Sequence, residues 1–249
     1  MASGTKKKRL FTRVLRIFLR GTLVLFGLHF LYLLLLIWVY PPITLTQVGS
    51  LIDGDGLKQK HISLNDIDPQ IALAFICAED QLFAEHDGFD WKSIEKAMEN
   101  NKENPEKIRG ASTISQQVAK NVFLWQGRSW FRKGLEVYCT FLIEKIWGKR
   151  RILEMYLNVA QTGKGVYGIE AAAQYYFHKP ASRLTNAEAA RIAACLPNPE
   201  VYSVDKPSPY IKKRTQWILK QMQNLNGEKH LWKLLYPSEK DKKEDRRSK

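Results

Sequence analysis

Apolar residues recur every three to four positions along most of the chain, which is the spacing of helices that bury one face. Residues that cap helix N-termini precede these stretches, namely Asp68, Asp90, Thr113, Ser129, Thr185 and Ser208. Two of them, Thr113 and Thr185, form capping boxes with Gln116 and Glu188. Alternating patterns typical of strands are scarce. The sequence therefore predicts a compact, mainly α domain, which we place at residues 65–236.

One stretch near the N-terminus is apolar without interruption. Residues 21–40 carry no formal charge, and a helix of that length spans roughly 30 Å, the thickness of a hydrocarbon core. A cleaved signal peptide would have a shorter apolar region and a small-x-small cleavage site, whereas this stretch runs on into WVYPPITL. We therefore predict a single N-terminal transmembrane helix at residues 21–40.

Charge is distributed unevenly along the chain. Half of the formal net charge of +14 comes from basic residues before Gly21, and no acidic residue occurs before Asp53. By the positive-inside rule, we expect residues 1–20 to form a basic cytoplasmic tail. The chain after the transmembrane helix would then lie on the opposite side of the membrane. We expect residues 41–64 to be a membrane-proximal linker, and residues 237–249, with the run KDKKEDRRSK, to be a charged disordered tail.

The three cysteines, Cys77, Cys139 and Cys195, lie in apolar helical sequences without a CxxC or Cys/His metal-binding spacing. A thiol nucleophile needs a polarising environment, and the neighbouring sequence offers none. We therefore expect all three cysteines to be buried and to pack as small hydrophobic residues. A disulfide between two of them stays open at this stage.

The stretch AEDQLFAEHDGF, residues 78–89, places ionisable side chains directly behind the apolar run IALAFIC. If residues 70–78 are helical, Glu79 lies at the C-terminal end, where the negative helix dipole and apolar neighbours both raise a carboxyl pKa. A raised pKa suits a general acid or base that works near neutral pH. The alternative is a solvated helix end. His86, taken alone, is more typical of a structural histidine.

Two further stretches carry candidate anion-binding residues. In GASTISQQVAKN, the polar residues Ser112, Thr113, Gln116 and Gln117 surround a helix N-terminus that attracts phosphate, with Lys120 one turn further on. In RSWFRKGLE, the side chains of Arg128, Arg132 and Lys133 bring three cations close together. The cations together would neutralise a diphosphate leaving group. The alternatives are an ordinary capped helix and a solvated Arg132–Glu136 pair, which is weak in energy.

Aromatic and apolar residues accompany the second of these stretches, namely Phe123, Leu124, Trp125, Trp130 and Phe131. Such residues pack in a core in many proteins. Here they are interleaved with Arg128 and Arg132, a combination that resembles a membrane-interface surface. In a chain with a transmembrane helix, this surface indicates a site that takes a lipid-linked substrate.

Together these stretches resemble the ordered motifs of the family 51 peptidoglycan glycosyltransferases. The first, Glu-Asp-x-x-Phe-x-x-His-x-Gly, is matched by Glu79, Asp80, Phe83, His86 and Gly88. The second, Gly-[Gly/Ala]-Ser-Thr-Ile-[Thr/Ser]-Gln-Gln, is matched by residues 110–117. The third, Arg-Lys-x-x-Glu, is matched by Arg132, Lys133 and Glu136. The fourth, Ile-Leu-x-x-Tyr-Leu-Asn, is matched by residues 152–158. With a fifth region, the resemblance covers roughly residues 65–205, with core motifs at 78–205. Each motif alone is weak, but five in order are very specific.

The resemblance implies a lysozyme-like glycosyltransferase domain that polymerises lipid II into glycan strands at the outer face of a bacterial inner membrane. Glu79 would act as the general base that deprotonates the 4-hydroxyl of the acceptor lipid II. The resulting attack on C1 of the growing chain would invert that carbon and expel undecaprenyl diphosphate. Glu136 would be the second catalytic glutamate and would position the neighbouring cations or a divalent metal.

The resemblance also assigns the remaining site residues and partners. The diphosphate-binding residues would be Lys120, Arg128, Arg132 and Lys133, and the cleft residues would be Asp80, Phe83, His86, Ser112, Thr113, Gln116 and Gln117. A divalent cation (Mg²⁺ or Mn²⁺) near the diphosphate is compatible with this assignment, its ligands are unknown, and no organic cofactor is implied. The expected partners are lipid II, the growing lipid-linked glycan, the membrane and other cell-wall synthesis or division proteins, and no nucleic acid.

Two other functions would explain parts of the sequence. A lysozyme-like hydrolase or lytic enzyme acting on finished glycan would need no diphosphate site, so the cation cluster argues against it. A non-catalytic envelope scaffold would need no Glu79. Ser93 and Lys96 match the Ser-x-x-Lys motif of penicillin-binding transpeptidases, but the partner motifs are missing, so we expect a monofunctional member of the family. In the fifth region, this chain has YYFHKPAS where the family usually has Tyr-Phe-Gly. This departure affects only the expected geometry of the loop around His178.

Overall fold

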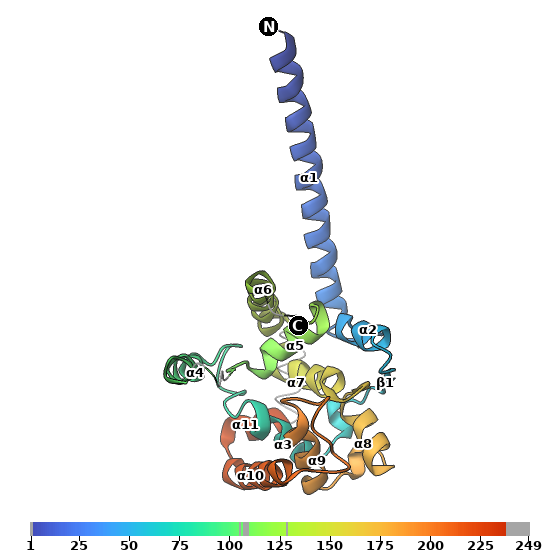
Figure 1. Cartoon of the computed structure of the whole chain (residues 1–249), viewed down its shortest axis with the longest axis vertical. Coiled ribbons are helices and arrows are strands. Elements are labelled where there is room, and N and C mark those ends of the chain that lie inside the picture. The colour runs from blue at the N-terminus through green and yellow to red at the C-terminus, as the bar shows by residue number, and fades with distance from the viewer. Residues whose placement is uncertain (1, 105, 107–109, 128, 238–249) are drawn as a thin grey trace. The chain divides into compact units, whose positions relative to one another are not determined.

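The structure, a computed structural model, describes residues 2–104, 106, 110–127 and 129–237 and divides into two compact units, residues 1–40 and 41–249 (Figure 1). The elements run in the order α1 (Ala2–Leu35), α2 (Leu45–Ile52), β1 (Lys58–Gln59), η1 (Leu64–Asp66), α3 (Pro69–Glu79), α4 (Trp91–Glu103), α5 (Ile114–Phe123), α6 (Trp130–Ile146), α7 (Gly148–Val159), β2 (Gln161–Gly163), β3 (Val166–Tyr167), α8 (Ile169–Phe177), η2 (Ala181–Arg183), α9 (Asn186–Cys195), α10 (Pro209–Leu225) and α11 (Lys229–Leu235). The prediction of a mainly α fold is confirmed.

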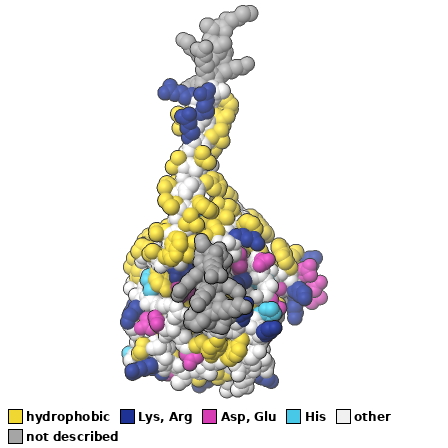
Figure 2. Space-filling model, turned by 180° about the vertical axis from the view of Figure 1, so that it is seen from behind, with side chains coloured by type: hydrophobic (Ala, Val, Ile, Leu, Met, Phe, Trp, Pro, Cys, Tyr) yellow, Lys and Arg dark blue, Asp and Glu magenta, His cyan; other side chains and the backbone are white. Residues whose placement is uncertain are grey.

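The first unit is built on α1. Its segment Phe11–Leu35 is long and apolar enough to cross a membrane, and basic side chains gather toward the N-terminal end of the helix (Figure 2). The sequence predicts this helix at residues 21–40, whereas it begins at Ala2 and ends at Leu35. Pro41 and Pro42 follow, and the helix does not continue through them because a proline lacks the backbone N–H and disfavours the helical conformation in the residue before it.

Helix α3 lies at the centre of the second unit. Residues 71–77 are all buried, as expected for a helix that is apolar on every side. It packs against α9 and α10 (Figure 1). Asp68 caps its N-terminus by accepting a hydrogen bond from the backbone N–H of Gln70 at 2.9 Å. Because α3 is enclosed by its neighbours, its last residue, Glu79, has a fixed position in the domain.

Helices α5, α6 and α7 form a second group, in which α5 packs against both of the others. Thr113 forms the predicted capping box at the start of α5, and the hydroxyl of Ser129 caps α6. On α6, Cys139 and Ile143 are buried. The outer face of α6 is also apolar, which leaves hydrophobic side chains at the surface of the domain.

The segment 41–64, predicted as a linker, folds as part of the second unit. It contains α2, which begins with a capping box at Thr44, and β1, which pairs with β3 in the small sheet β1-β3-β2. The domain therefore begins near Pro41 rather than at residue 65. Residues 238–249 of the predicted C-terminal tail lie outside the described residues.

The cysteines are buried, as the sequence predicts, and all three are unpaired, which settles the question of a disulfide that the sequence left open. Burial raises the pKa of the Cys77 thiol to about 12 and those of Cys139 and Cys195 to about 11. All three therefore stay protonated near neutral pH and are poor nucleophiles.

Candidate functional site

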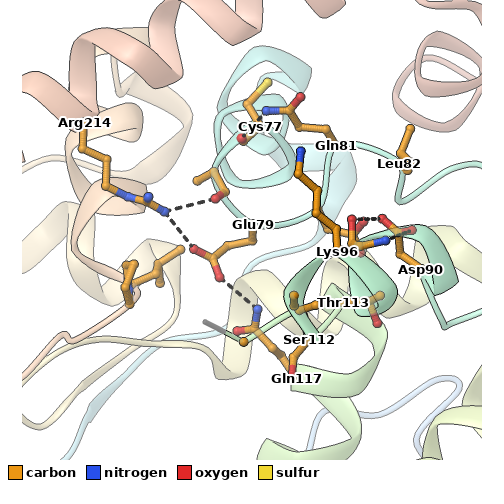
Figure 3. A pocket seen from close by; sticks show the side chains of 18 of the residues that line it. Cys77, Glu79, Gln81, Leu82, Asp90, Lys96, Ser112, Thr113, Gln117 and Arg214 are labelled. Atoms are coloured by element: carbon orange, nitrogen blue, oxygen red, sulfur yellow. Dashed lines mark hydrogen bonds and ion pairs between the residues drawn. The ribbon is translucent and has the colours of Figure 1, made fainter. Parts of the chain in front are cut away.

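Glu79 lines a cavity of about 910 Å³ that lies beside the C-terminal end of α3 (Figure 3). The residues around the cavity come from α3 and the turn after it, from α4, from the start of α5, and from α10. Of the predicted site residues, the cavity is lined by Glu79, Asp80, Ser112, Thr113, Gln117 and Lys120. Phe83, His86, Gln116, Arg132, Lys133 and Glu136 lie outside its lining, and Arg128 lies outside the described residues.

Two side chains hold the Glu79 carboxylate from opposite sides. The side-chain amide of Gln117 on α5 donates a hydrogen bond to Oε2 at 2.9 Å, and Nη2 of Arg214 on α10 lies 3.5 Å from Oε1 (Figure 3). The guanidinium of Arg214 also donates to the carbonyl of Ala78 at 3.1 Å, which fixes its direction. The carboxylate is thereby aimed into the cavity.

Burial raises the pKa of Glu79 above its ordinary value of 4.5, and Gln117 and Arg214 offset part of the rise by stabilising the ionised form. The side chain of Glu79 is only 14 % exposed. The predicted direction of the shift is correct, and burial is its largest cause. A carboxylate with a raised pKa at the floor of a cavity is a candidate general base.

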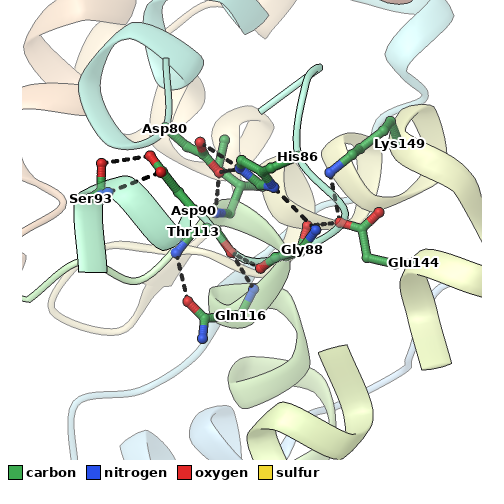
Figure 4. A network of polar contacts seen from close by, with 11 residues as sticks. Asp80, His86, Gly88, Asp90, Ser93, Thr113, Gln116, Glu144 and Lys149 are labelled. Carbon is green, nitrogen blue, oxygen red and sulfur yellow. Dashed lines mark hydrogen bonds and ion pairs between the residues drawn. The ribbon is translucent and has the colours of Figure 1, made fainter. Parts of the chain in front are cut away.

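The neighbouring Asp80 has a different role, because its oxygens are used within the protein (Figure 4). It accepts hydrogen bonds from Nε2 of His86 at 2.9 Å and from the backbone N–H of Ile114, the first residue of α5, at 2.9 Å. The backbone N–H of Gly88 donates to Nδ1 of His86 at 3.1 Å, which assigns the imidazole proton to Nε2. Asp80 and His86 therefore tie the end of α3 to the start of α5.

The two glutamines of the second motif point in different directions. Gln117 reaches Glu79, whereas the side-chain oxygen of Gln116 accepts the backbone N–H of Thr113 at 3.0 Å and completes the helix cap. The hydroxyl of Thr113 also donates to the carbonyl of Gly88 at 2.7 Å. Gln116 is thus buried in the cap and does not line the cavity, contrary to its predicted place in the cleft.

Phe83 supports this network from behind and, like Gln116, is not a cleft residue. Its side chain is buried, its ring meets that of His86 edge to face at 6.3 Å, and Nζ of Lys149 lies 4.6 Å from the ring centroid. The first motif therefore places Glu79 and Asp80 at the cavity and uses Phe83 and His86 as packing and hydrogen-bonding support.

Lys120 supplies a positive charge at the cavity. It has no carboxylate partner within ion-pair distance in the part of the chain that the structure describes. Burial lowers the pKa of Lys120 below its ordinary value of 10.5, and the Glu136 carboxylate offsets part of that fall. Arg132 and Lys133 lower the same pKa further, so these cations lie close enough to Lys120 to repel it.

Glu136 is buried and binds both neighbouring cations of α6. One carboxylate oxygen accepts from Nη1 of Arg132 at 3.0 Å, and the other accepts from Nζ of Lys133. The alternative of a solvated pair is wrong for Arg132–Glu136, because both side chains are nearly enclosed. Glu136 therefore holds two cations in place beside Lys120.

The same contacts test whether these residues suit a divalent metal. A metal site needs carboxylate oxygens that are free to bind the ion, and both oxygens of Glu136 are already paired with cations. Among the described residues, no group of three or more His, Cys, Asp or Glu side chains is placed to hold a metal. The side chains of this site do not fit a protein-bound metal ion.

Comparison with known proteins decides the family. Residues 46–223 match the sequence model of the family described as Transglycosylase. The chain belongs to the transglycosylase family. This match spans the elements from α2 to α10, so it includes the segment predicted as a linker and reaches beyond residue 205, where the resemblance read from the sequence ends.

Close relatives of this transglycosylase carry a descriptive name. The chain is 60 % identical over 185 residues to the biosynthetic peptidoglycan transglycosylases of Shigella boydii serotype 4 and of Escherichia coli strain K12/DH10B, covering 73 % of this chain and 76 % of each relative. The protein of the same name from Shigella sonnei matches equally well.

Several residues of the transglycosylase site were not predicted from the sequence. Arg214 and Trp217 reach the cavity from α10, and Lys96 reaches it from α4. A signal for Arg214 exists, because this arginine interrupts the buried stripe of α10 between Ile211 and Ile218. A charge beside a buried stripe needs a partner, but the sequence alone does not identify Glu79 as that partner.

The aromatic cluster is divided between core and surface. Leu124 is buried and Phe123 packs against the ring of Trp147 at 5.9 Å. Trp130 and Phe131, in contrast, are 91 % and 72 % exposed at the start of α6. The outer face of α6 continues this apolar surface through Val137, Tyr138 and Phe141, which are also exposed.

Proposed function

We propose that this protein polymerises lipid II into glycan strands, with Glu79 as the general base. Membership of the transglycosylase family, together with its biosynthetic relatives, makes the chain a peptidoglycan glycosyltransferase. The observation that carries the finer proposal is the placement of Glu79 and Lys120 on one cavity, a base with a raised pKa beside a cation. The base would accept the proton of the attacking hydroxyl group, and the cation would neutralise the negative charge that develops on the leaving diphosphate.

In the proposed step, Glu79 takes the proton from the 4-hydroxyl of an acceptor lipid II. The oxygen forms a bond to C1 of the lipid-linked sugar on the growing chain as the bond from C1 to the phosphate oxygen breaks, which inverts the carbon. The electron pair of the broken bond leaves with undecaprenyl diphosphate. Proton transfer of this kind contributes typically 10²- to 10⁴-fold to the rate when the base is correctly placed.

The leaving diphosphate requires positive charge near the breaking bond. Lys120, Arg132 and Lys133 provide it, and Glu136 keeps the last two from spreading apart. Three cations and one carboxylate leave a formal charge of +2 for the anion. A divalent cation, Mg²⁺ or Mn²⁺, would have to be held mainly by the phosphate oxygens and water, because the carboxylate in this cluster is already paired.

A hydrolase acting on finished glycan is supported less well by this cavity. Glycoside hydrolysis by the usual mechanism needs a second carboxyl group across the scissile bond. The other carboxylates at the cavity are engaged, since Asp80 binds His86 and Ile114, and Asp90 caps α4 through Ser93. The charges that remain beside Glu79 are positive, from Lys96, Lys120 and Arg214.

The surface of α6 supports a membrane-bound substrate. Exposed aromatic side chains such as Trp130 and Phe131 favour the interface between water and lipid, and α1 is apolar enough to anchor the chain in a membrane. We place the chain in the bacterial inner membrane, with residues 1–20 in the cytoplasm and the catalytic domain outside. From the family's role in peptidoglycan synthesis, we also propose other cell-wall synthesis or division proteins as partners.

Incubation of the purified full-length protein with lipid II tests this function. A lipid II polymerase should produce long glycan chains and release undecaprenyl diphosphate. Cleavage of finished glycan strands without polymer formation would indicate a hydrolase, and neither reaction would indicate a scaffold.

A further inference from the structure

The flank of α10 beside the cavity carries a row of aromatic side chains. Residues four and seven positions apart share one side of a helix, so Tyr210, Arg214 and Trp217 lie on the same flank. Arg214 and Trp217 line the cavity, and Figure 3 shows Arg214 reaching from α10 to Glu79. This flank therefore borders the cavity, while Ile211 and Ile218 face the core.

The aromatic surface continues beyond the cavity. Tyr210 is 51 % exposed and Trp217 is 44 % exposed. Seven helical positions separate the two along the axis by about 10.5 Å. Tyr202, which precedes α10, places its ring 5.5 Å from that of Tyr210, with an angle of 40° between the planes. The rings of Trp217 and Tyr210 thus share one flank of α10, and the ring of Tyr202 adjoins that of Tyr210.

We propose that Trp217, Tyr210 and Tyr202 form a stacking track that begins at the cavity wall with Trp217 and binds the growing glycan strand beyond the catalytic cavity. Contiguous exposed apolar surface is one mark of a ligand-binding site, and this surface adjoins the catalytic cavity at Trp217. Sugar rings present apolar C–H faces that pack on aromatic rings, while their hydroxyl groups remain in water. The inference rests on the proposed polymerisation of lipid II, because a strand that lengthens must lie against some surface outside the cavity.

The length of the track selects the growing strand as its occupant. An acceptor lipid II carries a single disaccharide, which would be used up at the cavity itself. Only the growing strand has further sugars to place along α10. The track would keep that strand near Glu79 between successive additions, so its loss would shorten the products.

Binding of a lipid-free glycan tests the track without requiring catalysis. The full-length protein in detergent is titrated with chitohexaose, a β-1,4-linked hexamer of N-acetylglucosamine, by isothermal titration calorimetry. We expect Tyr210→Ala to weaken binding by about tenfold, which corresponds to 1.4 kcal/mol at 25 °C. Tyr210→Phe keeps the ring and should bind like the wild type. Tyr175→Ala, which removes a tyrosine that is 46 % exposed on α8, serves as the matched control.

The proposed track would be wrong if chitohexaose did not bind the wild type. It would also be wrong if chitohexaose bound Tyr210→Ala and Tyr175→Ala with equal affinity. Lipid II polymerisation by the same proteins separates this result from the proposed function. A protein that polymerises lipid II but binds chitohexaose independently of Tyr210 has the function and lacks the track. A protein that needs Tyr210 for chitohexaose but makes no polymer has the track and lacks the function.

Discussion

The guanidinium of Arg214 lies 3.5 Å from the carboxylate of Glu79, although 135 residues separate them in the sequence. On its other side, Glu79 accepts a hydrogen bond from Gln117. Burial raises the pKa of Glu79, and Arg214 limits the rise. Burial therefore favours the protonated form of Glu79, whereas Arg214 favours the ionised form.

This balance predicts the acidic side of the pH–rate profile. Because a general base must be ionised, activity falls as the pH drops through the pKa of Glu79. Removing the positive charge with Arg214→Gln should raise that pKa further and move the acidic limb of kcat/KM to higher pH. Arg183→Gln, which removes the same charge from the surface around η2, should leave the limb in place. Identical limbs in both variants would show that the charge of Arg214 does not act on Glu79.

Lys120 predicts the alkaline side of the same profile. Burial and the neighbouring cations lower the pKa of Lys120, so its charge is lost at a lower pH than that of an ordinary lysine. Activity should fall as the pH rises through this lowered pKa. Lys120→Arg retains the charge at all accessible pH values, because arginine stays protonated, and should move the alkaline limb upward even if the rate at neutral pH decreases. An unmoved limb would assign the alkaline loss to another group.

The sequence predicted the parts of the site that depend on local signals. Asp68, Pro69 and the apolar run before Glu79 predict both the helix and the carboxylate at its end. The capping box at Thr113 predicts the start of α5, but not that Gln117 would face the cavity while Gln116 closes the cap. That difference depends on how α5 packs against α3. Arg214 was missed for a similar reason, since only the packing of α10 on α3 brings it to Glu79.

Gly88 holds a position that other residues cannot adopt easily. Its φ angle is +88°, and an added Cβ would lie 2.9 Å from side-chain atoms of both Thr140 and Glu144. Gly88→Ala should therefore destabilise the protein by about 1–3 kcal/mol. Gly134→Ala is the control, because Gly134 lies within α6 with open space around it, and should stabilise the helix by up to about 1 kcal/mol. Denaturant unfolding of both variants measures the difference, and equal midpoints would contradict the close approach of α6 to Gly88.

The exposed aromatic residues near the start of α6 predict membrane binding by the second unit. A protein comprising residues 41–249 with Trp125→Ser and Trp130→Ser should associate with lipid vesicles more weakly than the unmodified unit, because both indoles would otherwise insert at the interface. Flotation with vesicles measures the change, and Tyr175→Ser on α8 is the control. Unchanged flotation would mean that these residues do not contact lipid.

The most direct measurement is lipid II polymerisation by Glu79→Gln alongside the wild type. The substitution keeps the size of the side chain and one acceptor oxygen, and removes its ability to accept a proton. If Glu79 is the general base, Glu79→Gln should lose at least about 10²-fold in turnover, the lower end of the contribution of a general base, while it still binds lipid II. Turnover at the wild-type rate would contradict the assignment of Glu79 as the base.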